Sequence, residues 1–217
     1  MAVYKRTYPS REQWLEARRN RIGGSDAAAC MGLNPYKDNV TFWEEKMGLT
    51  VPEDISDRPY VRYGTEAETY LRRMFALDFP EYRVEYSENN MYLNTRYPWM
   101  HASLDGVLVD PEGRYGVLEI KTTEIQRGSQ RVKWEGRIPD NYYCQVLHYL
   151  AVTEYEFAVL KAQLKSGTGM DTRMEIRHYL IERSEVEEDI QALVEAEKKM
   201  YDCIQSGRRP DLILPAI

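Results

Sequence analysis

The chain has 217 residues and a formal net charge of −6, so it can bury a sizeable core and is not a protein that coats nucleic acid indiscriminately. Its cysteines are three in number and far apart, which fits a reducing compartment and excludes a zinc or iron–sulfur site built from cysteine pairs. No apolar run approaches membrane-spanning length, and no signal-peptide core is found at the N-terminus. We therefore expect a globular, cytoplasmic protein with no membrane partner.

The first third of the chain predicts helices, which sequence patterning places at residues 10–19, 27–31, 39–47 and 60–76. Residues of the types that favour helix N-caps stand at or near the start of the first three helices, namely Ser10, Ser25 and Asn39. Trp14 and Leu15 are expected on the buried side of the first helix.

The remaining sequence predicts strands at 82–86, 91–93, 100–109, 115–122, 156–164 and 173–181, with helices at 139–152 and 184–205. Ser184 is the expected cap of the last helix. No internal repeat, low-complexity segment or linker divides the chain. We predict a single domain over residues 1–217, of α/β or α+β class, with a mixed sheet and helices before, within and after it.

Candidate catalytic residues lie in the hairpin formed by two of these strands, which an Asp-Pro-Glu-Gly turn at 110–113 joins. Because strand side chains alternate, Glu119 and Lys121 share one face while Ile120 points into the core. The same alternation puts on one face of the preceding strand His101, Ser103 and Asp105. Two carboxylates and an ammonium are then expected to converge on one side of the hairpin.

These residue types suit metal-dependent cleavage of phosphodiesters. Carboxylate oxygens hold hard cations such as Mg²⁺, which lower the pKa of a water and stabilise the charge that develops on the phosphate. Lys121 would orient or deprotonate the attacking water and balance the negative charge. The alternative is an ordinary surface hairpin in which Glu-Ile-Lys is only polar and apolar alternation, and the hairpin alone leaves both interpretations open.

Three further motifs lie in the predicted helices. A G-x-x-x-E pattern ends at Glu68, upstream of the sheet. A P-x-x-Y-x-x-Q pattern after the sheet carries Tyr142 and Gln145, which share a helix face because they are three residues apart. Near the N-terminus, an R-x₆-S pattern joins Arg18 to Ser25.

Basic residues gather at 11–21 and 127–137, and acidic residues gather at 182–189. Local basic stretches on an acidic chain indicate focused phosphate contacts, although solvated helix faces would give the same pattern.

The whole ordered set resembles the YqaJ-type viral recombinases, relatives of bacteriophage lambda exonuclease within the PD-(D/E)xK nuclease superfamily. It comprises R-x₆-S with I-G-G-S-D, then N-P-Y-K, F-W-x-x-K-x-G, G-x-x-x-E, S-x-D-G, E-x-K and P-x-x-Y-x-x-Q, from about residue 14 to 152. Each motif alone is common, but all of them in this order are specific. The resemblance implies a restriction-endonuclease-like core, which is a central mixed sheet flanked by helices.

The resemblance also implies roles for particular residues. The metal ligands it implies are Asp105, Glu119, the backbone carbonyl of Ile120, and Glu68. Lys121 corresponds to the catalytic lysine, and Gln145 to a glutamine that orients the water or contacts the cut strand. Two alternatives stay open, namely that Glu68 is a solvated helix acid and that Gln145 is only a helix-end or exposed polar residue.

A second pocket follows from the same resemblance. Arg18, Ser25 and Ser103 match residues that hold a terminal 5′-phosphate, with Tyr142 as a further DNA contact. Guanidinium and hydroxyl groups are suitable donors for such an anion. Ser25 could instead be only an N-cap, and the arginines at positions 19 and 21 compete with Arg18 for the phosphate.

The implied activity is a Mg²⁺-dependent 5′→3′ exonuclease acting on double-stranded DNA ends. It would use two Mg²⁺ ions, which Mn²⁺ could replace, and leave 3′ overhangs for phage-type recombination. Implied partners are two further copies in a homotrimer and a single-strand annealing protein, with a phage- or prophage-encoded enzyme working in the bacterial cytoplasm. The alternatives are a DNA endonuclease of the same fold and a non-catalytic DNA-binding protein, against which the presence of Asp105, Glu119 and Lys121 argues.

Overall fold

The centre of the molecule is a five-stranded sheet. The structure, a computed structural model, describes residues 2–214. The strands follow the order β3–β6–β7–β8–β9, which are Arg83–Glu85, Gly106–Val109, Tyr115–Glu124, Phe157–Ser166 and Arg173–Glu182. β7 and β8 run parallel, and the other neighbouring pairs run antiparallel. The sheet is therefore mixed, as the sequence predicts.

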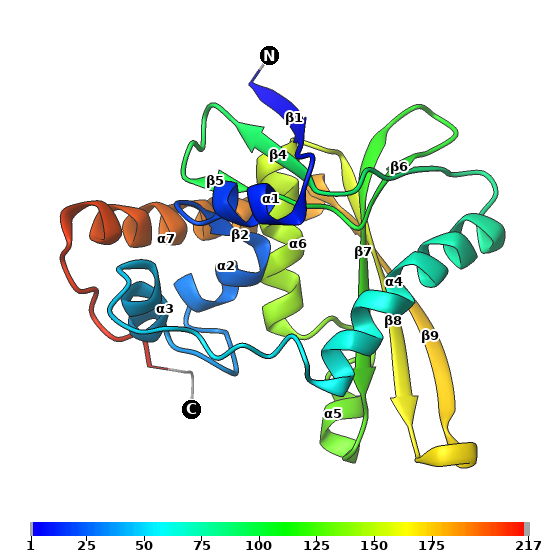
Figure 1. Cartoon of the computed structure of the whole chain (residues 1–217). Coiled ribbons are helices and arrows are strands. Elements are labelled where there is room, and N and C mark those ends of the chain that lie inside the picture. Colours follow the sequence, from blue (N-terminus) through cyan, green and yellow to red (C-terminus); the bar gives the residue numbers. More distant parts are fainter. Residues whose placement is uncertain (1, 215–217) are drawn as a thin grey trace.

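Two helices cover opposite faces of this sheet. α6 (Asp140–Thr153) lies on the connection from β7 to β8, after the short α5 (Gly128–Val132), because parallel neighbours need a long crossover. Figure 1 shows α6 on one side of the sheet and α4 (Pro59–Asp78) on the other. The helices expected at 139–152 and 60–76 are thus confirmed.

Each face of the sheet packs into its own hydrophobic cluster. On one side, Phe75 of α4 packs with Leu118 of β7. On the other side, Leu150 of α6 belongs to the same cluster as Val117. Successive residues of β7 therefore face opposite helices, and by this alternation Glu119 falls on the α6 side.

The remaining α-helices and strands surround α6. They are β1 (Val3–Thr7), α1 (Arg11–Arg18), β2 (Ile22–Gly23), α2 (Gly24–Cys30), α3 (Asn39–Lys46), β4 (Asn90–Asn94), β5 (Met100–His101), and α7 (Glu187–Ser206). β1 pairs with β4, and β2 pairs with β5. α2 packs against both α6 and α7. This layer brings the end of α1, which carries Arg18, against His101 at the end of β5.

The strand expected at 100–109 is interrupted, which corrects the predicted hairpin. β5 ends at His101 and pairs with β2, whereas β6 begins only at Gly106. Between them, Asn90 holds the backbone of Leu104 through both ends of its amide, at 2.9 Å and 3.0 Å. Because residues 103–105 lie outside a strand, the prediction that His101, Ser103 and Asp105 share one strand face is wrong.

The predicted N-caps have mixed outcomes. Ser10 caps α1 as expected. Gly23 is the N-cap of α2, so Ser25 lies within its first turn and the interpretation of Ser25 as an N-cap is wrong. Asp38 caps α3 in place of Asn39, whose buried amide instead bonds the C-terminal segment.

Two smaller expectations also fail. Leu15 is 47% exposed, and α1 buries none of its residues completely. Ser184 lies in the 3₁₀ turn η2 (Arg183–Glu185) and does not cap α7, which begins after Val186.

The C-terminal segment folds back on its own chain as far as the structure describes it. Ile213 lies against Gly32, and the amide of Asn39 bonds the backbone of both Asp211 and Ile213. No helix within residues 2–214 combines the length and the apolar character needed to cross a membrane.

Candidate functional site: a buried carboxylate centre beside an arginine pocket

Asp105 stands just before β6 and is held against β7. Its Oδ2 accepts a hydrogen bond from the backbone N–H of Ile120 at 2.8 Å. Its own carbonyl accepts a bond from the Arg72 guanidinium at 2.7 Å. These two bonds replace the strand pairing that the sequence predicted and still place Asp105 beside the E-x-K strand.

The E-x-K residues of β7 point in alternate directions, as expected. The Lys121 Nζ lies 2.6 Å from the Glu119 Oε1 on the α6 side. Ile120 packs into the hydrophobic cluster under α4. The predicted convergence of Asp105, Glu119 and Lys121 is confirmed as geometry, although Asp105 reaches it from an irregular segment.

α6 completes the site from above β7. The Gln145 amide donates from Nε2 to the Glu119 Oε1 at 2.8 Å and to the Tyr149 hydroxyl at 2.8 Å. The Lys121 Nζ lies 5.2 Å from the centre of the Tyr142 ring. Tyr142 and Gln145 therefore face the site together, and the alternative of Gln145 as an exposed or helix-end residue is wrong.

Burial dominates the electrostatics of this centre. It raises the pKa of Asp105 well above its usual value, and the nearby carboxyl of Glu119 raises it further. Burial also raises the pKa of Glu119, against the opposing effect of Lys121. The pKa of Lys121 is raised as well, because Glu119 and Asp105 outweigh the effect of its burial. The centre concentrates more negative charge than one lysine neutralises.

One oxygen of this centre suits a cation. The Glu119 Oε2 is buried and has no hydrogen-bond partner within residues 2–214. A buried carboxylate oxygen without a donor is costly unless a cation binds it. Carboxylate oxygens are ligands that hard divalent cations prefer. The donor set therefore fits a metal such as Mg²⁺.

Glu68 does not join this pair directly. Its Oε1 bonds Arg72 at 2.9 Å, one turn along α4, and the same guanidinium also bonds the carbonyl of Asp105. In the described part of the chain, no three His, Cys, Asp or Glu side chains gather closely enough to hold a metal by themselves. Glu68 nevertheless acts on both carboxyls, since it raises the pKa of Asp105 and of Glu119. Arg72, four residues from Glu68, could have been found from helix spacing.

The second predicted pocket forms around Arg18. The Arg18 Nε donates to the Nε2 of His101 at 3.1 Å, and its guanidinium lies 4.1 Å from the centre of the Trp14 ring. Trp14 donates in turn to the Ser103 hydroxyl at 3.1 Å. Arg18 and Ser103 are thus brought together through Trp14.

The three arginines that compete for the terminal phosphate have different surroundings. Arg19 is largely exposed and pairs with Glu16, and Arg21 donates to the carbonyl of Ala17. Arg18 alone of the three contacts His101. Ser25 is exposed at the start of α2, and no hydrogen bond of its hydroxyl is found within the described residues.

Tyr149 connects the carboxylate centre to the arginine pocket. Its pKa is raised well above the usual value, first by burial and then by Glu119 and Asp105, while Gln145 and Arg18 lower it. The α-carbon of Gly24 leaves no room beside this ring, because a Cβ there would lie 2.4 Å from the Tyr149 Cε1. Sequence reasoning missed Tyr149, although its position four residues after Gln145 puts it on the same helix face.

Comparison with known proteins places the chain in a family. The model of the YqaJ-like viral recombinase domain matches residues 13–156. The chain belongs to this family. The "Uncharacterized protein YqaJ" of Bacillus subtilis (strain 168) is 32% identical over 155 residues, which cover 70% of this chain and 46% of that protein. The match thus spans less than half of the relative's length.

Solved structures support the predicted fold. An alkaline exonuclease, LHK-Exo from Laribacter hongkongensis, matches with a TM-score of 0.63 at 20% identity, over 91% of this chain and 96% of that one. The same enzyme in complex with dAMP gives a TM-score of 0.66, also at 20% identity and with the same coverage. The predicted PD-(D/E)xK fold and the predicted YqaJ family are both confirmed.

An aromatic cleft adjoins the carboxylate centre of this YqaJ-family protein. Its volume is about 200 Å³, and its lining includes Tyr36, Trp134 and Tyr142, with Lys133 and Arg137 as cations. Tyr36 is 86% exposed. Tyr36 lies in the N-P-Y-K motif, but no sequence pattern indicates that it lines a cleft, because its loop joins the cleft only through the tertiary fold.

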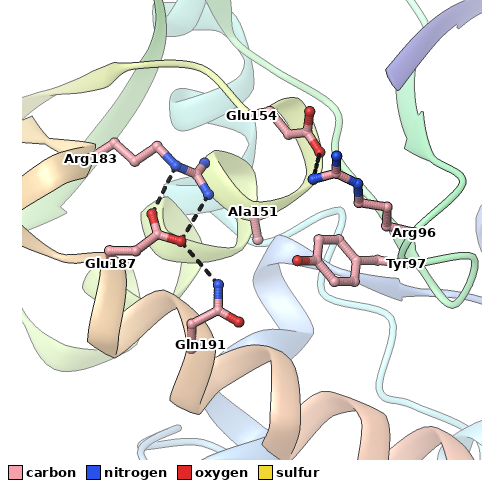
Figure 2. A pocket seen from close by; sticks show the side chains of 7 residues that line it. All are labelled: Arg96, Tyr97, Ala151, Glu154, Arg183, Glu187 and Gln191. Atoms are coloured by element: carbon pink, nitrogen blue, oxygen red, sulfur yellow. Dashed lines mark hydrogen bonds and ion pairs between the residues drawn. The ribbon is translucent and has the colours of Figure 1, made fainter. Parts of the chain in front are cut away.

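A polar cavity at the end of α6, lined by Ala151 and Glu154, is a weaker candidate for a ligand site in this YqaJ-family protein. Figure 2 shows Arg96 paired with Glu154, and Arg183 paired with Glu187. Gln191 donates to Glu187 as well. Since the charges that line the cavity are already paired with one another, none is left for a ligand.

Proposed function

We propose that this protein is a Mg²⁺-dependent exonuclease that degrades one strand of double-stranded DNA from its 5′ end. The observation that carries the proposal is the buried Glu119 carboxylate, whose Oε1 bonds Lys121 and whose Oε2 has no hydrogen-bond partner within residues 2–214, beside Asp105 in a chain of the YqaJ-like viral recombinase family. A carboxylate pair and an ammonium in a buried site match the needs of phosphodiester hydrolysis.

The cation would be held by Asp105 and Glu119, with the backbone carbonyl of Ile120 as a further ligand. Glu68 would join them on releasing Arg72, or would act through a water. Two Mg²⁺ ions, or Mn²⁺ in their place, would supply charge neutralisation at the phosphate and a more acidic water. The raised pKa values of both carboxyls support this assignment, because a bound cation is what would keep both ionised.

The chain's own residues then have separate tasks. Lys121, held 2.6 Å from Glu119, would orient the attacking water and place a positive charge beside the scissile phosphate. Gln145 fixes the Glu119 carboxylate through its amide and is the family's candidate for contact with the cut strand. Tyr142, beside Lys121, would contact the nucleotide that enters the aromatic cleft.

The arginine pocket gives the direction of digestion. Arg18 would bind the terminal 5′-phosphate, together with Ser25 and with Ser103 once the Ser103 hydroxyl releases the carbonyl of Asn90, so that the next phosphodiester bond falls at the carboxylate centre. The complex of LHK-Exo with dAMP supports a site that accepts a single deoxynucleotide. The resulting 3′ overhang would serve phage-type recombination in the bacterial cytoplasm.

Assembly is a further part of the proposal. A homotrimer around DNA, together with a single-strand annealing protein, would make digestion processive. Light scattering should then give three times the chain mass of 25.5 kDa. A monomer at working concentrations would contradict the trimer and leave the chemistry of the site untouched.

A plasmid digestion tests the activity. The same plasmid is supplied as a covalently closed circle and as a 5′-phosphorylated linear duplex, with Mg²⁺ and with EDTA. We expect loss of the linear form alone, with release of 5′-labelled nucleotide first. Cutting of the circle would instead show an endonuclease, and no cleavage with Mg²⁺ or Mn²⁺ would overturn the proposed activity and favour the non-catalytic alternative.

A further inference from the structure

His101 lies between the arginine pocket and the core. It is 2% exposed at the end of β5, where β5 pairs with Gly23 of β2. A Cβ at Gly23 would lie 2.8 Å from the Cε1 of the His101 ring, so the missing side chain of Gly23 makes room for the imidazole. The ring is turned toward Arg18 and not toward the carboxylate centre.

The Arg18 guanidinium is held from two directions. His101 accepts the bond from its Nε at 3.1 Å, and Trp14 lies under one face of the group. Trp14 is itself fixed, since its Nε1 donates to Ser103 and to the carbonyl of Asn90. In residues 2–214, the two terminal amino groups of Arg18 form no hydrogen bond or ion pair. These groups are the ones that bind a phosphate through two parallel hydrogen bonds.

The bond to Arg18 fixes the protonation of His101. Arginine is always a donor, so the Nε2 of the ring must be the acceptor and the proton of a neutral ring must be on Nδ1. Within the described residues that Nδ1 is buried and has no partner. The acceptor at Nε2 is therefore the only side-chain hydrogen bond that this buried histidine makes there.

The surrounding charges favour the neutral ring. Burial lowers the pKa of His101 well below its usual value, and the neighbouring Arg18, His148, Lys46 and Arg21 lower it further. No carboxylate in the described chain pairs with the ring. A charged imidazole would face Arg18 as a like charge and would lose the acceptor that holds it.

We propose that His101 is a positioning residue that holds the Arg18 guanidinium with its terminal amino groups free, and so sets the preference of the pocket for 5′-phosphorylated ends. This role rests on the proposed function, because it presupposes that Arg18 binds the terminal phosphate. It assigns to His101 a task that the hairpin pattern did not indicate, since the pattern placed His101 with Asp105.

The test compares two substitutions of similar size. His101→Phe keeps a ring but removes the acceptor, whereas His101→Gln keeps an oxygen that can accept from Arg18. The readout is the ratio of digestion rates on two duplexes of identical sequence, one with 5′-phosphate and one with 5′-hydroxyl ends. We expect the ratio to fall about tenfold in His101→Phe, as the loss of one charged hydrogen bond implies, and to recover largely in His101→Gln.

The outcomes separate the two proposals. A wild-type ratio near one would overturn phosphate recognition by the pocket, whatever His101 does. A high wild-type ratio that both variants retain would overturn the role of His101 alone. A purely structural role would lower both rates together and leave the ratio unchanged, which would also overturn it.

A second measurement, on the wild-type protein, tests the proposal even if the variants fail to fold. Long-range ¹H–¹⁵N spectra of the wild-type protein at pH 7 report which ring nitrogen of His101 carries the proton. The proposal requires the neutral ring protonated on Nδ1. A ring protonated on Nε2, or on both nitrogens, would overturn it without any substitution.

Discussion

The carboxylate centre and the arginine pocket both adjoin Tyr149, yet they manage buried charge in opposite ways. In the carboxylate centre, Asp105 and Glu119 outnumber the one ammonium beside them, and within residues 2–214 the Glu119 Oε2 has no hydrogen-bond partner. In the arginine pocket, one cation is held by a neutral ring and an aromatic face, and no carboxylate of the described residues pairs with it. Buried negative charge is in excess in the first region, and buried positive charge is in excess in the second.

The difference shows how a fold can bury opposite charges in two neighbouring regions. The carboxylate centre is built on the long strand β7 and on α6, and Asp105, from the irregular segment before β6, is held to the backbone of β7. The arginine pocket is built from short pieces, namely the end of α1, β5 and the segment after it. We expect substitutions in the first region to abolish chemistry, and substitutions in the second to change selectivity.

The largest expected effect lies in the carboxylate centre. Glu119→Gln keeps the shape of the side chain but removes its charge, so the site loses a metal ligand and the partner of Lys121. We expect digestion to fall by about 10³-fold or more, at the upper end of losses for removing one electrostatic group. Linear-duplex assays measure the rate, and circular dichroism serves as the folding control. A folded variant with near wild-type activity would remove Glu119 from the site.

The pH dependence of stability tests the excess of buried carboxyl groups in the carboxylate centre. A carboxyl whose pKa is raised in the folded state stabilises the protein below its unfolded pKa, and that stability is lost as pH rises through the folded pKa. Asp105 and Glu119 both have raised pKa values, so the metal-free protein should lose stability as pH rises above the ordinary carboxyl values of 3.8 and 4.5. Mg²⁺ should restore about 2–3 kcal/mol when present at about 100 times its Kd.

Thermal unfolding between pH 4 and pH 8, with Mg²⁺ and with EDTA, checks this expectation. Asp105→Asn should flatten the pH dependence and abolish the shift with Mg²⁺. An equal shift with Mg²⁺ in the wild type and in this variant would place the cation elsewhere.

A smaller effect is expected from the arginine pocket. Arg18→Ala should reduce the preference for 5′-phosphorylated ends by about 10- to 100-fold, because charged hydrogen bonds contribute about 1.5–3 kcal/mol. Arg19→Ala is the matched control, since Arg19 is exposed and, among the residues that the structure describes, pairs only with Glu16. Competition between phosphorylated and hydroxyl-ended duplexes measures the preference. Equal losses in the two variants would contradict the distinction between these arginines.

The smallest effect is expected in the aromatic cleft. Tyr36→Ala should weaken binding of single-stranded DNA by about fivefold, near the lower limit for loss of one base-stacking contact. Tyr70→Ala, which removes an exposed tyrosine from α4, is the control. Fluorescence anisotropy with a labelled oligonucleotide and no divalent cation gives both values. Similar affinities for the two variants would exclude stacking on Tyr36.

Much of this arrangement could be predicted from local patterns. Alternation placed Glu119 and Lys121 on one face, and helix spacing placed Tyr142 beside Gln145. Both predictions depend only on the period of a strand or a helix, which neighbouring residues determine. For the same reason the long helices and the strands at 156–164 and 173–181 were predicted close to their observed bounds, whereas the short strands β1 and β2 were not predicted.

The errors arose where tertiary contacts override local preference. Asn90, distant in sequence, holds the backbone before β6 and interrupts the expected strand, so the side chain of His101 points to a different region from that of Asp105. Asn39 has the chemistry of an N-cap but is used to bind the C-terminal segment. Neither pairing leaves a periodic signal, because each joins segments without regular spacing.

The contact of Gly24 with the Tyr149 ring has a consequence for the size of what is released. The Gly24 backbone and the Tyr149 phenol meet with no adjustable side chain between them, so the distance between the proposed phosphate pocket and the proposed cleavage centre is fixed. A strand seated by its terminal phosphate would be cut one set distance inward, whatever bases it carries. The position of the cut would thus be set by this distance, and the protein would need no base-specific contacts to choose it.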